Sequence, residues 1–141
     1  MAVKNYRGGS GCSLIFGAID ISGLTNGVFI SVERDTDAFT KVVGADGEGM
    51  RSKSNDKSAT ITITLMQSSS SNDALSAIAA LDEATAQGIF PFIFKDNSGR
   101  TLIDCETAWI QKVAPTSFGQ EAETREWVLQ TDSCNIFVGG N

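Results

Sequence analysis

The chain has 141 residues, 41% of them hydrophobic and 20% charged, which is the composition of a single globular domain spanning residues 1–141. Its formal net charge of −6 argues against a nucleic-acid-binding protein, because such binding depends on Lys and Arg contacts to phosphates. The longest apolar run, GIFPFIF, is too short to cross a membrane, and the first residues lack the apolar segment of a secretory signal.

The missing signal segment, the absence of histidine and the small number of cysteines bear on the compartment and on the chemistry of the protein. Without a signal segment, we expect the protein to work in the cytoplasm, where it is made. Histidine, the usual proton-transfer side chain near neutral pH and the commonest metal ligand, is absent. Cys12, Cys105 and Cys134 form an odd, widely spaced set without a CxxC motif, which disfavours a disulfide framework and a zinc site. We expect them to be small, partly buried hydrophobic residues.

The first elements are expected to be β-strands. Segments 12–19 (CSLIFGAI) and 27–34 (GVFISVER) are short and rich in β-branched and aromatic residues, with Gly, Asn and Ser between them. This pattern predicts a pair of strands. The following DAFTKVV segment, residues 37–43, is expected to continue the same sheet.

Residues 41–65, KVVGADGEGMRSKSNDKSATITITL, divide into two parts. Residues 42–58 are rich in Gly and carry charges of both signs, which predicts an extended arm or loop. In the second part Ile61, Ile63 and Leu65 alternate with threonines, which predicts a strand with one apolar and one hydroxyl face. Such a strand is an aggregation hazard at an open edge, so we expect it to pair with a neighbour, including another subunit.

The remaining chain predicts one helix and further strands. Leu75, Ile78 and Leu81 recur at helical spacing in the segment SSSSNDALSAIAALDEATAQG, residues 68–88, with Ser71 or Asn72 as the cap and Gly88 as a left-handed C-terminal residue. Residues 89–113 predict a hairpin in which Gly99 takes positive φ within the DNSG turn, and Pro91 makes its strand an edge or irregular strand.

The last two strands are expected in TREWVLQTDS and NIFVG. The fold class is therefore mainly β: a β-sandwich or partly closed barrel of roughly seven or eight strands with one flanking α-helix.

No motif indicates a catalytic, cofactor or metal site. The acidic pairs at 35/37 and 46/48 lack the other ligands of a calcium loop, and the Gly-rich stretches lack the Lys-Ser/Thr step of a phosphate cradle. Asp104 and Glu106 share one face of a strand, where an acid–base pair is conceivable, but a solvated acidic face is the better interpretation. Trp109 and Trp127 are expected to be core anchors. We expect a protein that is not an enzyme and binds no cofactor.

The order of motifs resembles the tail tube proteins of contractile-tailed bacteriophages. The resemblance runs over about residues 28–141 and is most specific in VGADGEGMRS, DKSATITITL and SND, followed by PFIFKDNSGRTL, AWIQK, REWVLQT and VGGN. It implies a structural subunit of the virion tail, assembled in the host cytoplasm into hexameric rings. These rings stack into a hollow tube through which the genome enters the host, and the inner sheets of the subunits join into one continuous barrel.

The resemblance also implies partners and sites. The partners are other copies of the chain, the tail sheath, the baseplate and the tail terminator, while DNA passes through the lumen without specific binding. An extended arm reaches the adjoining ring in related tubes, which makes residues 42–58 the candidate contact between rings, with the charged residues Asp46, Glu48, Arg51, Lys53, Asp56 and Lys57. We expect Thr60, Thr62 and Thr64 to face the lumen, with Asp104 and Glu106 as candidate acids there.

Two other functions remain open at this point. One is a tail-completion or sheath-associated virion protein of similar fold, which forms a single ring and stops. The other is a β-sandwich that binds a carbohydrate or another small ligand. The sequence distinguishes neither from a tube subunit.

Overall fold

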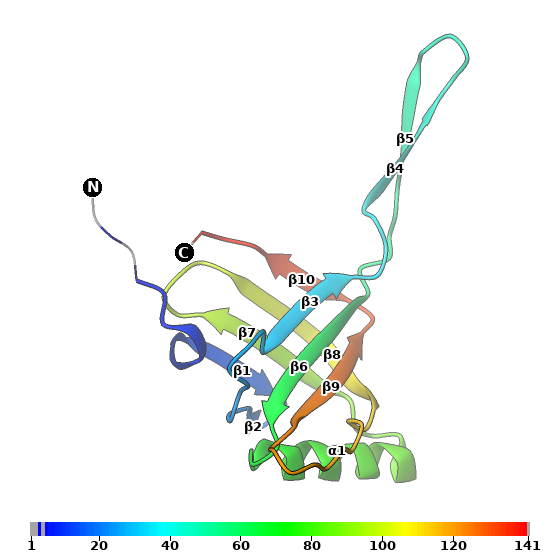
Figure 1. Ribbon diagram of the computed structural model, residues 1–141. Helices are drawn as coiled ribbons and strands as arrows, with labels where there is room; N and C mark the ends of the chain where they lie inside the picture. The colour runs from blue at the N-terminus through cyan, green and yellow to red at the C-terminus, as the bar shows by residue number, and fades with distance from the viewer. Residues whose placement is uncertain (1–2, 4, 141) are drawn as a thin grey trace.

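The computed structural model describes residue 3 and residues 5–140 (Figure 1). A short 3-10 helix at Gly8–Gly11 precedes the first strand, and one α-helix, α1 (Ser71–Thr85), interrupts the strands. No helix in the described part of the chain is long and apolar enough to span a membrane. The strands are β1 (Cys12–Phe16), β2 (Ile19–Asp20), β3 (Ile30–Arg34), β4 (Phe39–Val43), β5 (Gly49–Lys53), β6 (Ala59–Met66), β7 (Phe90–Asp96), β8 (Leu102–Lys112), β9 (Thr124–Thr131) and β10 (Cys134–Phe137).

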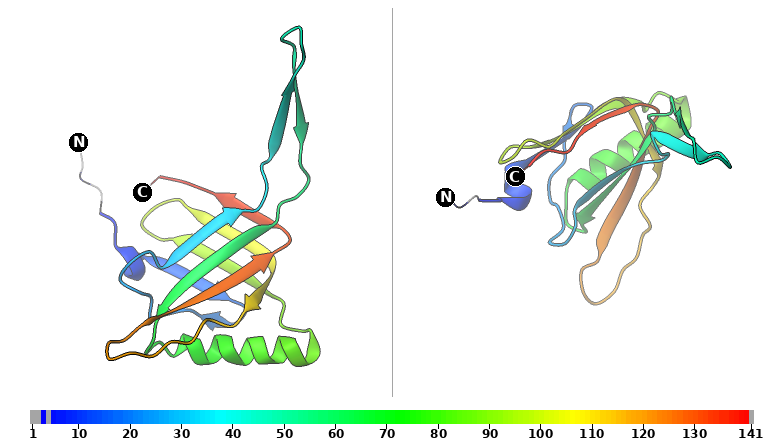
Figure 2. Two further views of the ribbon diagram at one scale, coloured as in Figure 1. Left: turned by 45° about the vertical axis from the view of Figure 1, so that its right-hand side comes forward. Right: turned by 90° about the horizontal axis from the view of Figure 1, so that it is seen from above.

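Eight of the strands form one antiparallel sheet in the order β2-β1-β7-β8-β9-β6-β3, with β10 also paired to β8. The long strand β8 makes this branching possible: its first half pairs with β10 and its second half with β9. The sheet folds over on itself around this strand and encloses the core without closing into a complete barrel (Figure 2). The mainly β fold expected from the sequence is confirmed.

The core forms where alternate residues of the strands meet. On β6, Ile61, Ile63 and Leu65 are fully buried, as the alternation in the sequence predicts. Facing strands contribute large side chains, among them Phe16, Phe92 and Leu129. These residues fix the register, because a shift by one position would turn the apolar set of a strand toward solvent.

The pairing of the first strands differs from the expectation. Residues 12–19 and 27–34 do not pair with one another: β1 pairs with β2 and β7, whereas β3 pairs with β6 along Ile30–Arg34. Only Ile19 and Asp20 continue the first segment as a strand. The alternation of a strand identifies its buried face but not its neighbour, which depends on contacts far away in the chain.

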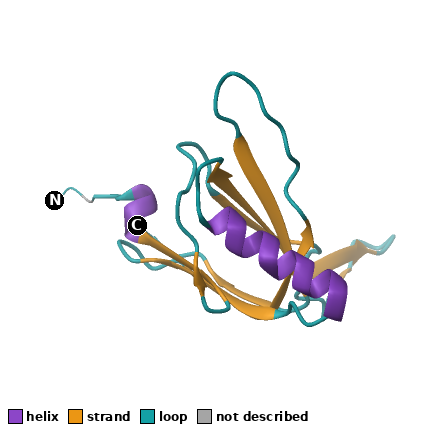
Figure 3. Cartoon of the chain, turned by 90° about the horizontal axis from the view of Figure 1, so that it is seen from below, coloured by secondary structure: helices purple, strands orange, loops and turns teal. Residues whose placement is uncertain are grey.

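The helix α1 lies across one end of the folded sheet (Figure 3). Its buried residues are Ser71, Leu75 and Ala79, a narrower stripe than predicted, and Leu81 is 44% exposed. The left-handed C-terminal residue is Ala86, with φ of 58°, so the assignment of this position to Gly88 was wrong. Gly88 instead packs closely on Asp82, which accepts a hydrogen bond from its backbone N–H at 3.1 Å.

The residues near the helix start also differ from a simple cap. The N-cap is Ser70, whose side chain makes no cap hydrogen bond, while the Asn72 side-chain amide donates to the carbonyls of Met66 and Ser69. The Asn72 oxygen accepts a 3.0 Å hydrogen bond from Trp127 Nε1, which satisfies the polar atom of this buried side chain. Asn72 thus joins the helix to β9. Trp127 is the expected core anchor, but Trp109 is only half-buried and points to the opposite face.

The predicted hairpin at residues 89–113 is confirmed as β7 and β8. Its turn is organised by Asp96, whose carboxylate accepts hydrogen bonds from the backbone and hydroxyl of Ser98, so Gly99 does not need the positive φ that was expected. The pairing register shifts between Phe90 and Phe92, so the strand is irregular at Pro91 as predicted. However, β7 lies inside the sheet between β1 and β8 rather than at an edge.

Candidate assembly surfaces

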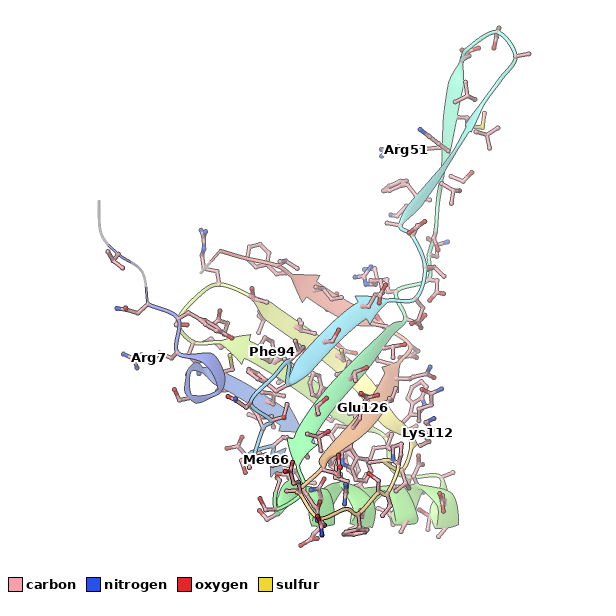
Figure 4. The ribbon with its side chains drawn as sticks, in the orientation of Figure 1. Arg7, Arg51, Met66, Phe94, Lys112 and Glu126 are labelled. Atoms are coloured by element: carbon pink, nitrogen blue, oxygen red, sulfur yellow. The ribbon has the colours of Figure 1, made fainter. Side chains whose placement is uncertain are left out.

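Residues 39–53 form a two-stranded hairpin, hereafter the arm, which projects from the body at the end opposite α1 (Figures 1 and 4). Every residue of β4 and β5 is exposed. The expectation that DAFTKVV continues the main sheet was wrong, because β4 pairs only with β5 in a separate two-stranded sheet. The dipeptide Asp46–Gly47, which lies between two short segments, is the sequence signal that could have predicted this hairpin.

The two faces of the arm differ in chemistry. In the register Phe39↔Lys53 and Lys41↔Arg51, directly opposed residues share a face, which makes this side basic. The Arg51 guanidinium lies 4.1 Å from the centroid of the Phe39 ring. The other face contains Val42 opposite Met50, which are 70% and 75% exposed. One side of the arm therefore carries its cations, and the other carries the exposed apolar pair Val42 and Met50 beside the uncharged pair Thr40 and Ser52.

The acidic residues of the arm gather at its tip, in the loop at residues 44–48. Asp46 accepts a 3.2 Å hydrogen bond from the Glu48 backbone N–H, and Gly47 takes a φ of 88° that few side chains tolerate. The Gly44 N–H donates to the Glu48 carbonyl at 2.8 Å, which closes the loop. The charges are thus separated along the arm, with acids at the tip and bases on the shaft.

The last two residues of the predicted contact set, Asp56 and Lys57, lie at the root of the arm. The Asp56 carboxylate accepts a 2.9 Å hydrogen bond from the Ser58 backbone N–H. Hydrogen bonds from the Ser58 side chain and backbone hold the pKa of this exposed carboxyl below its usual value. Lys57 uses its backbone carbonyl to accept from the Cys134 N–H at 3.0 Å. Through these two hydrogen bonds, Asp56 and Lys57 stabilise the root of the arm.

The threonine side of β6 forms a second exposed surface, hereafter the hydroxyl face. Thr60, Thr62 and Thr64 are half-buried and point away from the core, while the isoleucines between them are buried. Thr60 Oγ1 donates to Asp35 at 2.7 Å. Across the strands, Thr60 lies between Glu33 and Gln130, Thr62 lies between Ser31 and Val128, and Thr64 lies opposite Glu126.

Three exposed acids lie on the hydroxyl face: Asp35, which accepts the hydrogen bond from Thr60, and Glu33 and Glu126, which the sequence pattern did not single out. Glu126 is labelled in Figure 4. Lys112 pairs with Val128 at the margin, after a register shift in β8. The candidate acid Asp104 lies elsewhere, because its cross-strand partners are Ile93 and Asn135. The location of Glu33 and Glu126 on this face can be deduced only when the pairing of β3 and β9 with β6 is known, because these acids lie opposite Thr60 and Thr64.

The described residues contain no group of three or more Cys, Asp or Glu side chains placed to hold a metal ion. The cysteines are packed as expected, with Cys105 and Cys134 buried and Cys12 half-buried.

The chain matches a known protein family over most of its length. Residues 8–139 match the model of a family described as the bacteriophage PhiTE tail tube protein. The chain is also 35% identical to structural protein ORF10 of Pseudomonas phage KPP10, over 123 residues that cover 86% of this chain and 71% of that protein.

Solved structures of contractile systems share the fold. The tube-terminating cap of the anti-feeding prophage superposes with a TM-score of 0.59 at 10% identity, covering 97% of this chain and 94% of the cap chain. A chain of the sheath–tube complex from the extracellular contractile injection system PVC superposes with a TM-score of 0.55 at 12% identity, covering 89% of this chain and 87% of that chain.

Proposed function

The chain belongs to the bacteriophage PhiTE tail tube protein family and is thus a structural subunit of a phage tail, and on that premise we propose how it assembles. Copies of the chain form hexameric rings, the rings stack into a hollow tube, and the viral genome passes through the tube into the host. The observation that carries this proposal is the arm: a hairpin with fully exposed strands, basic on one face and uncharged with two exposed apolar side chains on the other, which projects from one end of the domain.

The arm supports stacking because of where it points. A head-to-tail contact that does not close grows a filament, and the arm and α1 lie at opposite ends of the subunit (Figure 1). An arm at one end of each subunit therefore reaches the opposite end of a subunit in the next ring. Val42 and Met50 supply apolar area for this contact, and the separated charges of Arg51, Lys53 and the acidic tip set its register.

Ring closure is supported by the edges of the sheet. Strand β3 pairs with β6 on one side, and no described strand pairs with its other edge. An open edge of this kind invites pairing with another chain, and lateral joining of neighbouring subunits removes it. In the ring, the β3-β6-β9 strands of the six subunits continue into one barrel around the lumen.

The hydroxyl face lines that lumen in the proposed assembly. Thr60, Thr62 and Thr64 offer neutral hydroxyls, and Glu33 and Glu126 add negative charge on the same face. Carboxylates repel phosphates, and uncharged hydroxyls make no counterion-releasing contacts, so DNA moves along this wall without being retained. The outer surface then meets the sheath, and the ends of the tube meet the baseplate and the terminator. Assembly takes place in the host cytoplasm.

A second candidate is a ring-forming terminator or tail-completion protein, which the likeness in fold to the anti-feeding prophage cap favours. Electron microscopy of the purified protein distinguishes the two. A tube subunit forms tubes of uniform width and variable length, whereas a terminator forms single rings. A small-ligand-binding β-sandwich stays monomeric, and that result would contradict both assembly functions.

A further inference from the structure

The structure brings two of the three cysteines together at the base of the arm. Cys105 on β8 and Cys134 on β10 are direct cross-strand partners, and both are fully buried. Their Sγ atoms are 2.7 Å apart. A disulfide bond is about 2.0 Å long, so a movement of about 0.7 Å would join the two sulfurs.

The backbone around Cys134 shows which kind of cross-strand pair this is. The Cys134 N–H donates to the Lys57 carbonyl at 3.0 Å, and the Cys134 carbonyl accepts from Arg34 Nη2 at 2.7 Å. Both backbone groups therefore point away from β8, which makes Cys105 and Cys134 a non-hydrogen-bonded pair. Cα atoms in such pairs are about 4.5 Å apart, within the range that a disulfide spans.

These two hydrogen bonds also connect Cys134 to both roots of the arm. Arg34 is the last residue of β3, before the chain enters the arm, and Lys57 lies just before β6, where the chain returns. Residues Lys57 and Ser133 form a parallel bridge beside this point. Whatever fixes Cys134 to β8 therefore also fixes the base of the arm to the sheet.

We propose that Cys105 and Cys134 form a disulfide by exchange with an oxidised small-molecule disulfide, such as glutathione disulfide, once the protein leaves a reducing compartment, and that this bond locks the base of the arm onto β8. The bond forms within one chain and is independent of tube assembly, so it can be tested on the unassembled protein. Free thiols in the cell and a disulfide outside it follow the usual redox difference between these environments.

The exchange proceeds in two steps. The Cys134 thiolate attacks one sulfur of glutathione disulfide, which forms a mixed disulfide and releases one glutathione thiolate. Cys105, after losing its proton, attacks the Cys134 sulfur, forms the intrachain bond and releases the second glutathione. The two protons lost by the cysteines end on the two glutathione thiols. Two electrons thus pass from the cysteine sulfurs to the glutathione pair.

The surroundings of the pair select Cys134 as the attacking sulfur. A hydrogen bond from the Cys105 thiol, together with the nearby Arg34 guanidinium, lowers the pKa of Cys134, while the same hydrogen bond and burial raise the pKa of Cys105. Arg34 Nη2 is held at the Cys134 carbonyl, and Arg34 Nε is buried without a hydrogen-bond partner in the described part of the chain, so the positive charge lies close enough to favour a Cys134 thiolate. Access requires local opening of β10, a strand of four residues.

The test uses reduced protein incubated with glutathione disulfide, blocked with a thiol alkylating agent, digested and analysed by mass spectrometry. The expected product is a peptide pair joined through Cys105 and Cys134, lighter by two hydrogen atoms, with Cys12 alkylated. The Cys12→Ala variant serves as the control and gives the same crosslink, whereas Cys105→Ala and Cys134→Ala do not.

Thermal unfolding supplies a second measurement on the wild-type protein. The bond closes a loop between residues 29 positions apart, so we expect oxidation to raise the unfolding midpoint by roughly 5–10 °C and dithiothreitol to reverse the change. Free thiols at both positions after oxidation, a stable glutathione adduct on either one, or a crosslink through Cys12 would each overturn the proposal. So would a crosslink that leaves the midpoint unchanged.

Discussion

The Arg51 guanidinium lies 4.1 Å from the centroid of the Phe39 ring, across the two strands of the arm. This cation–π contact holds Arg51 on the basic face, beside Lys53 and Lys41. A lone two-stranded hairpin is only marginally stable in water, and this one has no packed face of its own. The contact therefore helps to keep the arm in the shape that a neighbouring subunit is proposed to bind.

Charge reversal at Arg51 and Lys53 is expected to stop stacking without unfolding the protein. Both side chains are exposed, so Arg51→Glu/Lys53→Glu should change the unfolding midpoint little. Each exposed ion pair contributes only about 0 to 1 kcal/mol, but a ring repeats the change in every subunit. Negative-stain microscopy and sedimentation should show folded subunits or single rings in place of tubes.

The matched control for that variant is Arg51→Lys/Lys53→Arg, which keeps both charges and should still form tubes. Normal tubes from the charge-reversed protein would remove these residues from the contact between rings.

Reversing the acids of the hydroxyl face is expected to make the lumen retain DNA. Glu33→Lys/Glu126→Lys places cations beside the threonines of β6, and Lys contacts to phosphates release counterions and increase affinity. Labelled duplex DNA should cosediment with tubes of this variant at low salt, and the binding should decrease steeply as salt is added. Wild-type tubes should not retain the duplex. Equal DNA binding by the two kinds of tube would place these residues outside the lumen.

Substitutions on the two faces of β6 are expected to differ strongly in stability. Ile63→Ala removes a fully buried side chain and should lower the free energy of unfolding by about 2–5 kcal/mol. Thr62→Ala, one residue away on the half-buried face, should cost less than about 1 kcal/mol. Urea unfolding of the unassembled protein measures both. Similar losses would mean that the threonine face also packs inside the subunit.

The root of the arm should respond to acid through Asp56. Hydrogen bonds from Ser58 depress the pKa of this carboxyl in the folded state, so it contributes stability above its unfolded pKa of about 3.9 and loses that contribution as pH falls through the lower folded value. The difference in unfolding midpoint between wild type and Asp56→Asn should therefore shrink as the pH is lowered below about 4. A difference that stays constant over this range would contradict the role of the ionised carboxylate.

The parts of this fold that depend on local pattern could be predicted from the sequence. Alternation identified the buried face of β6, and helical spacing with a change of period identified α1. The DNSG turn and the apolar segments around it identified the β7–β8 hairpin. Each of these signals lies within about 25 residues of sequence, where turn chemistry and periodicity act directly.

The parts that depend on long-range pairing could not be predicted. β1 and β3 look like neighbours in the sequence, but their partners are β7 and β6, which are brought in by the folding of the whole sheet. The same limit applied to the hydroxyl face: Thr60, Thr62 and Thr64 were visible as an alternating set, whereas Glu33 and Glu126 join them only through cross-strand register.

The most direct test of the account is removal of the arm. The strands of the arm, within residues 39–53, pair with no strand of the main sheet, and Ser54 N–H donates to the Ala38 carbonyl at 2.8 Å, so a short Gly-Ser turn can close the chain there. Electron microscopy of the purified wild type and the deletion variant should show tubes from the first, and single rings with an unchanged unfolding midpoint from the second. Tubes from the armless protein, or rings and monomers alone from the wild type, would contradict the proposal that this subunit builds a tube through its arm.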